Sequence, residues 1–175
     1  YYITPKISWD QDKLWGHPYF YFTWGAAISE ALLDINTGES RILRADIVQD
    51  CGNSLNENID IGQIEGGFIQ GLGWLTCEEL CFSKEGKLLT TGPSTYKLPG
   101  SRDIPQIFNV KLLEKADNEE KTIFRSKAVG EPPLLLAISH FLALKEAIRA
   151  SSTNSRPELL NSPATPSEIL KVLKV

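Results

Sequence analysis

The chain has 175 residues, a formal net charge of −4 and a hydrophobic share of 42%. This length predicts one domain, or a part of a larger one, that can bury a core. The mild acidity gives no reason to expect nucleic acid or an anionic membrane as a partner. No apolar run reaches the roughly 18 residues of a membrane span. Because the chain shows no signal-peptide pattern and no methionine, we expect a processed product or a piece of a longer protein.

Residues 1–22 are rich in aromatic side chains and show no regular pattern. We expect an irregular arm that lies against this domain or a neighbour, because so much aromatic surface is rarely left in water. The remaining residues, 23–175, are expected to form one subdomain.

Residues 24–50 predict a β-hairpin whose loop contains Asn36-Thr37-Gly38. In the second strand, Leu43, Ala45 and Ile47 alternate with charged residues. We therefore expect these three side chains to face the core.

The stretch from about residue 60 to residue 80 predicts a helix with Asp60 as its N-cap. Its apolar residues follow helical spacing: Ile61, Ile64, Phe68, Leu72 and Leu75. Five glycines lie inside the same stretch, and each costs roughly 1 kcal/mol relative to alanine: Gly62, Gly66, Gly67, Gly71 and Gly73. Such a helix is expected where another helix or a ligand approaches the backbone closely, and the pattern alone favours helix packing. Gln63, Gly67 and Gln70 share a face, which would present amide groups on a bare surface.

The three cysteines, Cys51, Cys77 and Cys81, are an odd and sparse set. They predict free thiols in a reducing compartment, and hence a cytoplasmic protein. Cys77 and Cys81 would share a face of the predicted helix. A metal site there is disfavoured because neither His17 nor His140 is spaced to supply a third ligand. His140 lies in an apolar helical stretch and is expected to be a core or boundary residue.

The second half of the chain alternates between loops, short strands and helices. Residues 91–105 are rich in turn formers and predict a long ordered loop, which is often functional. Residues 107–114 and 123–125 predict two short strands. A capping box at residues 165–168 predicts a terminal helix that ends at Leu173. The elements together predict an α+β fold, with a mixed or antiparallel sheet covered by helices at 60–80 and 132–151.

The segment Lys127-Ala128-Val129-Gly130-Glu131-Pro132-Pro133-Leu134 sets one carboxylate between a glycine and two prolines. Proline favours the first helical position, so Glu131 is expected at the N-terminal edge of the 132–151 helix. Gly130 leaves room for another group beside the carboxylate. A fixed carboxylate that is reachable from one side suits a general base. An acidic helix cap is the alternative, and from this stretch alone it is the favoured one.

Three segments occur in a characteristic order: Gly62-Gln63-Ile64-Glu65-Gly66-Gly67-Phe68-Ile69-Gln70-Gly71, then Gly92-Pro93-Ser94-Thr95-Tyr96-Lys97, then the segment around Glu131. Together they resemble the xanthine dehydrogenase–aldehyde oxidase family of molybdenum hydroxylases, in the carboxy-terminal part of its molybdopterin-binding chain. The resemblance covers nearly all of residues 20–173.

The resemblance implies an enzyme that carries molybdenum on a molybdopterin, with FAD and 2Fe-2S clusters on other parts of the enzyme. It implies that Glu131 is the general base for the water-derived oxygen at molybdenum, which reverses the preference for a helix cap. It also implies that Gln63 hydrogen-bonds near that centre and that Gly130 lies against the cofactor. No metal ligand from the protein is expected, because the pterin supplies the sulfurs. The implied substrate is a purine, hypoxanthine or xanthine, oxidised to urate; an aldehyde or another N-heterocycle is the alternative.

The sequence lacks the upstream half of the family's molybdopterin-binding chain, which carries most pterin contacts. We therefore expect that half, and an iron–sulfur/FAD subunit or domain, as partners. Alone, the chain is expected to bind no cofactor, to turn over nothing, and to self-associate through exposed apolar surface. A non-catalytic packing module is the competing hypothesis. A phosphate-binding loop at 62–73 is disfavoured because no Lys-Ser/Thr follows the glycines.

Overall fold

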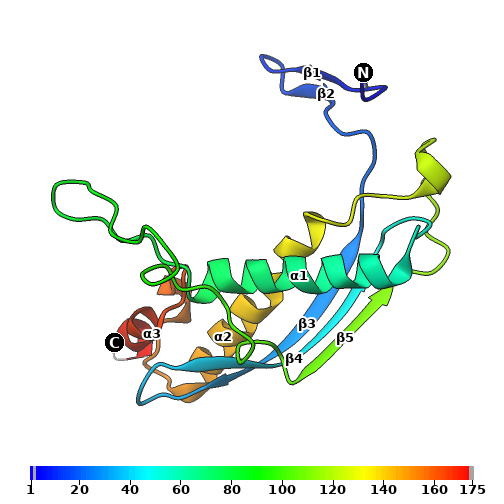
Figure 1. Cartoon of the computed structure of the whole chain (residues 1–175). Coiled ribbons are helices and arrows are strands. Elements are labelled where there is room, and N and C mark those ends of the chain that lie inside the picture. The colour runs from blue at the N-terminus through cyan, green and yellow to red at the C-terminus, as the bar shows by residue number, and fades with distance from the viewer. Residues whose placement is uncertain (2, 174–175) are drawn as a thin grey trace.

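A three-stranded sheet forms the centre of the computed structural model, which describes residue 1 and residues 3–173 (Figure 1). Strand β3 (Gly25–Leu33) pairs antiparallel with β4 (Ser40–Gln49), and β4 pairs parallel with β5 (Ile107–Leu112). Helix α1 (Glu57–Thr76) follows β4 and lies across the sheet. This mixed sheet with packed helices confirms the predicted α+β fold.

Strands β3 and β4 form the predicted hairpin, closed by a turn in which Gly38 donates its N–H to the Asp34 carbonyl at 2.8 Å. Ala45 and Ile47 of β4 are buried in the core, as predicted. The third buried apolar side chain is that of Ile42, and not that of Leu43 as predicted.

A β-bulge explains the wrong prediction for Leu43. Glu30 of β3 pairs with Arg44, whereas the next residue, Ala31, pairs with Ile42. Leu43 is the extra residue of the bulge, so the alternation of inward and outward side chains changes phase there.

Helix α1 packs its apolar residues against the inner face of the sheet. Four of the five predicted residues are buried, and only Ile61 is half-buried: Ile64, Phe68, Leu72 and Leu75 join Ile42, Ala45 and Ile47 in one cluster. The ring of Phe68 lies 5.5 Å, centroid to centroid, from that of Phe108 in β5. The helix is therefore held to the sheet along most of its length.

The ends of α1 differ from the prediction. Its N-cap is Asn56, whose side chain accepts the N–H of Ile59 at 3.3 Å. Asp60 lies in the first turn instead and accepts the Ser54 hydroxyl at 2.5 Å. Because α1 ends at Thr76, Cys77 is its C-cap and Cys81 lies beyond it, so the two thiols do not share a helix face.

The predicted 132–151 helix is divided into a 3₁₀ segment, η2 (Pro132–Ala137), and an α-helix, α2 (Ile138–Ser151). Helix α3 (Pro166–Leu173) confirms the predicted terminal helix, and a 3₁₀ turn, η3 (Pro157–Leu159), precedes it. A second core cluster joins α2 to this region through Leu144, Ile148, Leu160, Ala164, Ile169 and Val172.

The N-terminal arm is not wholly irregular, since it contains a small antiparallel pair of strands, β1 (Ser8–Asp10) and β2 (Trp15–His17). This pair stands away from the sheet and helices in Figure 1. Residues 123–125, predicted as a strand, form a 3₁₀ turn, η1 (Ile123–Arg125), because Ser126 donates its N–H back to the Ile123 carbonyl at 3.0 Å. In the described part of the chain, no helix is both long and apolar enough to cross a membrane.

Candidate functional site

Glu131 occupies the N-cap position of η2, with Pro132 as the first helical residue. Its side chain makes no capping hydrogen bond, and the residue is exposed. Pro133, two residues later, is fully buried and anchors the start of η2. The carboxylate therefore stands on a fixed backbone without being used to cap the helix, which weakens the alternative of a purely structural cap.

Gln63 lies next to the backbone that carries Glu131. Its Oε1 is 3.7 Å from the position that a Cβ on Gly130 would take. Gln63 comes from the first half of α1, whereas Gly130 precedes η2. The fold thus places the Gln63 carboxamide beside Gly130, the residue that precedes Glu131.

Two glycines of α1 serve helix packing. A Cβ on Gly67 would lie 3.3 Å from the Gly130 carbonyl oxygen, and a Cβ on Gly71 would clash with the carbonyl oxygen of Leu134. Glycine at these positions lets η2 and the loop before it lie against the backbone of α1. The predicted bare surface around Gln63, Gly67 and Gln70 is therefore wrong at Gly67, which is buried.

Two other glycines face open space. A Cβ on Gly62 or on Gly66 would meet no atom within 4 Å. Both line an open groove of about 970 Å³ along α1, together with Glu65, Ile69, Gln70, Trp74, Glu78, Leu98, Pro99, Ile104, Phe108 and Leu134. A ligand or another part of a larger protein can approach the helix backbone here, which a side chain would prevent.

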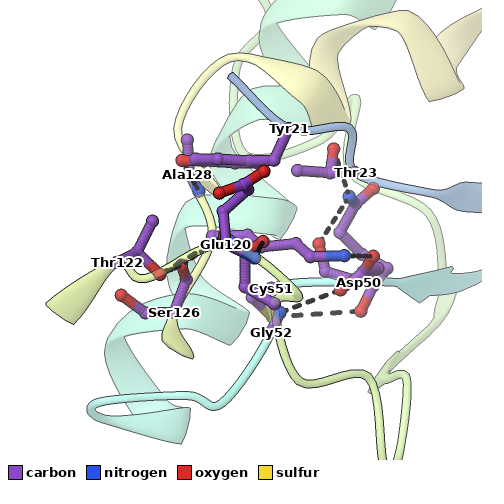
Figure 2. A network of polar contacts seen from close by, with 12 residues as sticks. Tyr21, Thr23, Asp50, Cys51, Gly52, Glu120, Thr122, Ser126 and Ala128 are labelled. Carbon is purple, nitrogen blue, oxygen red and sulfur yellow. Dashed lines mark hydrogen bonds and ion pairs between the residues drawn. The ribbon is translucent and has the colours of Figure 1, made fainter. Parts of the chain in front are cut away.

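A buried ion pair lies between the end of β4 and the Glu131 loop. The Lys127 Nζ donates to Asp50 Oδ2 at 2.6 Å, and the two side chains are 10% and 1% exposed. The other Asp50 oxygen, Oδ1, accepts the N–H of Gly52 at 2.8 Å. Figure 2 shows this polar network around Asp50.

Backbone hydrogen bonds join the same two segments. Lys127 donates its N–H to the Cys51 carbonyl at 2.8 Å, and Asn53 donates to the Arg125 carbonyl at 3.1 Å. Gly52 takes a φ of 64°, and a Cβ on it would clash with the Arg125 carbonyl oxygen. The left-handed conformation and the close approach both require glycine at this position.

The N-terminal arm also reaches this loop. Ala128 donates its N–H to the Tyr21 hydroxyl at 3.0 Å, and both residues are labelled in Figure 2. The chain leading to Glu131 is thus hydrogen-bonded to the end of β4 at Lys127 and to the arm at Ala128.

Of the three thiols, that of Cys51 is buried and that of Cys77 is partly buried. Burial, together with the charges of Asp60 and Asp50, raises the pKa of the Cys51 thiol to about 11, and burial raises the pKa of Cys77. Both thiols are therefore protonated at neutral pH and poorly suited to bind a metal. Within the described residues, no group of three or more His, Cys, Asp or Glu side chains could hold a metal ion.

Comparison with known proteins identifies the family of the chain. The family model of the molybdopterin cofactor-binding domain matches residues 1–105. The chain therefore belongs to the molybdopterin cofactor-binding domain family. It is 51% identical over 175 residues to xanthine dehydrogenase/oxidase of Felis catus and 50% identical over 174 residues to that of Rattus norvegicus. Each alignment covers 97% of the chain but only 13% of the relative, so the chain spans about an eighth of their length.

A solved structure supports the same assignment. The chain of quinoline 2-oxidoreductase from Pseudomonas putida 86 matches with a TM-score of 0.70 at 27% identity, over 81% of this chain and 17% of that one. The residues present fit one edge of a molybdopterin cofactor: open backbone at Gly62 and Gly66, and exposed carboxamides at Gln63 and Gln70.

The contribution of Asp50, Lys127 and Tyr21 to this region cannot be found from the sequence. Asp50 directly follows β4 and Lys127 precedes Glu131 by four residues, but the two are far apart along the chain. Only the fold brings their charges together. The sole sequence signal is a lysine inside the segment that carries the family resemblance.

Proposed function

We propose that the chain is a carboxy-terminal part of the molybdopterin-binding region of a xanthine dehydrogenase that oxidises hypoxanthine and xanthine to urate. The proximity of Gln63 to Gly130, directly before Glu131, is the observation that carries this proposal. The support for xanthine as the substrate is the identity of about half of the aligned residues with xanthine dehydrogenase/oxidase.

Glu131 is the proposed general base, and it accepts the proton of the water-derived nucleophile. An exposed carboxylate without a capping hydrogen bond is free to make that contact. The molybdopterin, when bound, supplies the oxygen-transfer and two-electron chemistry.

Gln63 and Gly130 are the proposed cofactor-side contacts of the chain. The Gln63 carboxamide can both donate and accept hydrogen bonds, so it can orient a polar group that lies beside Glu131. Gly130 has no side chain to stand between that group and the carboxylate. Neither residue supplies a metal ligand in this proposal.

Electrons leave the site, in this proposal, through 2Fe-2S clusters and FAD on other parts of the same enzyme. The partners of the chain are therefore the upstream half of the molybdopterin-binding region and an iron–sulfur/FAD subunit or domain. The open groove along α1 is the surface of the chain that supports such a larger assembly.

The test is Glu131→Gln in the full-length protein, which keeps the size of the side chain and removes the base. We expect the turnover of xanthine to fall about 10²- to 10⁴-fold, which is the usual contribution of a general base. Molybdenum content should stay at the wild-type level. Glu30→Gln, an exposed position on β3, is the matched control and should leave turnover unchanged.

A loss of less than tenfold in Glu131→Gln at normal molybdenum content would instead favour the non-catalytic packing module. A related activity on another N-heterocycle is the second candidate, because the chain is similar in structure to quinoline 2-oxidoreductase. Values of kcat/KM for xanthine, quinoline and benzaldehyde distinguish these activities: xanthine should be preferred, and a preference for either other substrate would replace xanthine dehydrogenase in the proposal.

A further inference from the structure

A buried charge pair, beside backbone hydrogen bonds, links the two segments that carry the proposed site. Residues 50–56 lead from β4 into α1, which carries Gln63, and residues 125–131 lead into η2, which begins after Glu131. The pair of Asp50 and Lys127 joins these segments, and its two side chains are almost completely buried.

From this geometry, we propose that Lys127, paired with Asp50, is a positioning residue that sets the place of Glu131 relative to Gln63. The inference rests on the proposed function, because it assigns to Lys127 an effect that acts through the Glu131 base. Lys127 itself touches no reacting atom in this proposal.

Both carboxylate oxygens of Asp50 accept hydrogen bonds, which fixes the orientation of the ion pair. One Asp50 oxygen accepts the Lys127 ammonium group at 2.6 Å and the other accepts the Gly52 N–H at 2.8 Å. The Gln49 side chain donates to the Asp50 carbonyl at 3.1 Å. The carboxylate therefore cannot rotate toward water without breaking its hydrogen bonds to Lys127 and Gly52.

Lys127 is held by its backbone as well as by its side chain. Its N–H donates to the Cys51 carbonyl at 2.8 Å, and the next residue, Ala128, donates to the Tyr21 hydroxyl at 3.0 Å. Val129 packs against the main core cluster and Pro133 is buried. Glu131 thus lies on a short span that is fixed on both sides, and Lys127 is the only charged anchor of that span (residues 127–133).

A buried ion pair is an inefficient way to gain stability, because the cost of desolvating two charges offsets much of their attraction. Its best-attested use is to fix a unique register between segments. The place of this pair, where the Gln63 helix and the Glu131 loop begin, agrees with such a use.

The test uses four variants of the full-length protein: Lys127→Met, Glu131→Gln, the double variant, and Lys171→Met as a control. Lys171 forms an exposed ion pair with Glu168 on α3 and lies outside the site. For Lys127→Met we expect kcat for xanthine to fall about 10- to 100-fold, since a displacement of about 1 Å can cost that much. KM and molybdenum content should change less than about threefold, and Lys171→Met should behave as the wild type.

The double variant separates positioning from a general structural role. If Lys127 acts through Glu131, Lys127→Met should cost nothing further once Glu131 is glutamine, so the double variant should match Glu131→Gln alone. Losses that multiply, or a kcat for Lys127→Met within about threefold of wild type, would overturn the inference.

A second variant keeps the test decisive if Lys127→Met fails to fold. Asp50→Asn keeps the size of the side chain and removes the charge that pairs with Lys127, and we expect kcat to fall about twofold to tenfold, the effect of weakening one hydrogen bond. That loss should vanish in the Glu131→Gln background, and an unchanged kcat overturns the inference. Glu131→Gln alone decides the proposed function: a large loss there with no effect of Lys127→Met rejects only the positioning role, whereas a small loss rejects both.

Discussion

His140 is a buried histidine whose imidazole is not fully hydrogen-bonded. It is 2% exposed, and in the described structure its Nδ1 has no hydrogen-bond partner. Burial lowers its pKa from 6.5 to about 4. The imidazole therefore stays neutral in the folded chain at pH values where an unfolded chain would bind a proton.

This difference predicts a pH-dependent stability. The pKa of His140 is lower in the folded chain than in the unfolded chain. The neutral imidazole therefore contributes fully to the free energy of unfolding above about pH 6.5, and this contribution is lost as the pH falls toward about 4. A tenfold difference in proton affinity between the folded and the unfolded chain corresponds to about 1.4 kcal/mol. Between pH 7 and pH 4.5 the folded chain should therefore lose about 2–3 kcal/mol through this residue.

Urea unfolding of the 175-residue chain, followed by tryptophan fluorescence, measures the effect. The free energy of unfolding should fall more steeply with acid in the wild type than in His140→Leu. His17→Gln, at an exposed position, should keep the wild-type slope. Equal slopes for wild type and His140→Leu would show that the histidine is not the cause.

Single residues also mark the limit of sequence-based prediction at the site. Glu131, Gly130 and Gln63 could be named because each lies in a short segment with a distinctive local pattern. Asp50 and Lys127 could not be paired, because neither segment specifies which distant charge it will meet.

Helix α1 contains glycines with opposite roles: two of them pack against the rest of the chain, and two face open space. Gly67 and Gly71 lie under η2, where a side chain would collide with backbone atoms, whereas Gly62 and Gly66 face the open groove. The pattern of five glycines predicted a close approach. It could not tell which glycine meets the chain itself and which faces the groove.

Alanine substitutions should separate these roles in urea unfolding of the chain. Gly71→Ala should destabilise it by about 1–3 kcal/mol, the usual cost of overpacking, because the Leu134 carbonyl must move. Gly66→Ala should stabilise it by up to about 1 kcal/mol, since alanine favours the helix and meets no atom. The full-length protein should respond differently, with Gly66→Ala lowering molybdenum content if the groove holds the cofactor edge.

Stabilisation by Gly71→Ala together with destabilisation by Gly66→Ala would contradict the packing described for these two glycines. Unchanged molybdenum content and turnover in the full-length Gly66→Ala protein would show that the open face contacts no cofactor. Gly86→Ala is not a suitable control, because Gly86 has a φ of 80° and alanine would be strained there. Gly92→Ala, with open space around it and an ordinary φ, is the matched control.

At the level of elements, the sequence predicted most helices and strands because their apolar residues follow simple periods. It missed the bulge at Leu43, where one extra residue changes the alternation. It also assigned residues 123–125 to a strand, because short apolar runs fit more than one structure. In the structure, hydrogen bonds from Ser126 and Thr122 close a turn there.

The whole molecule leaves a large apolar surface uncovered. The outer face of the sheet exposes Ile28 at 76%, Leu32 at 54%, Val48 at 40% and Ile107 at 48%. The arm exposes Trp15 at 74%, and Trp24 just after it is 68% exposed. Apolar surface of this extent usually marks an interface, and the curated relatives are several times longer than this chain.

We therefore expect the isolated chain to self-associate. Sedimentation velocity from about 1 to 100 µM should show an average mass that rises with concentration, because apolar faces gain free energy when they leave water. Ile28→Lys with Leu32→Lys should shift the chain toward the monomer, whereas Glu30→Gln on the same strand should not. A monomer of wild-type chain at high micromolar concentration would contradict this expectation.

The parallel pairing of β4 with β5 also bears on how the chain reaches its folded state. The β3–β4 hairpin is local and can form as soon as its turn closes, but β5 can add to it only after the whole of α1 and the following loop have been synthesised. Contacts between such distant parts of a chain carry a high closure entropy and form slowly. The residues around Glu131 follow still later, so during synthesis Gln63 leaves the ribosome well before the loop that will lie beside it.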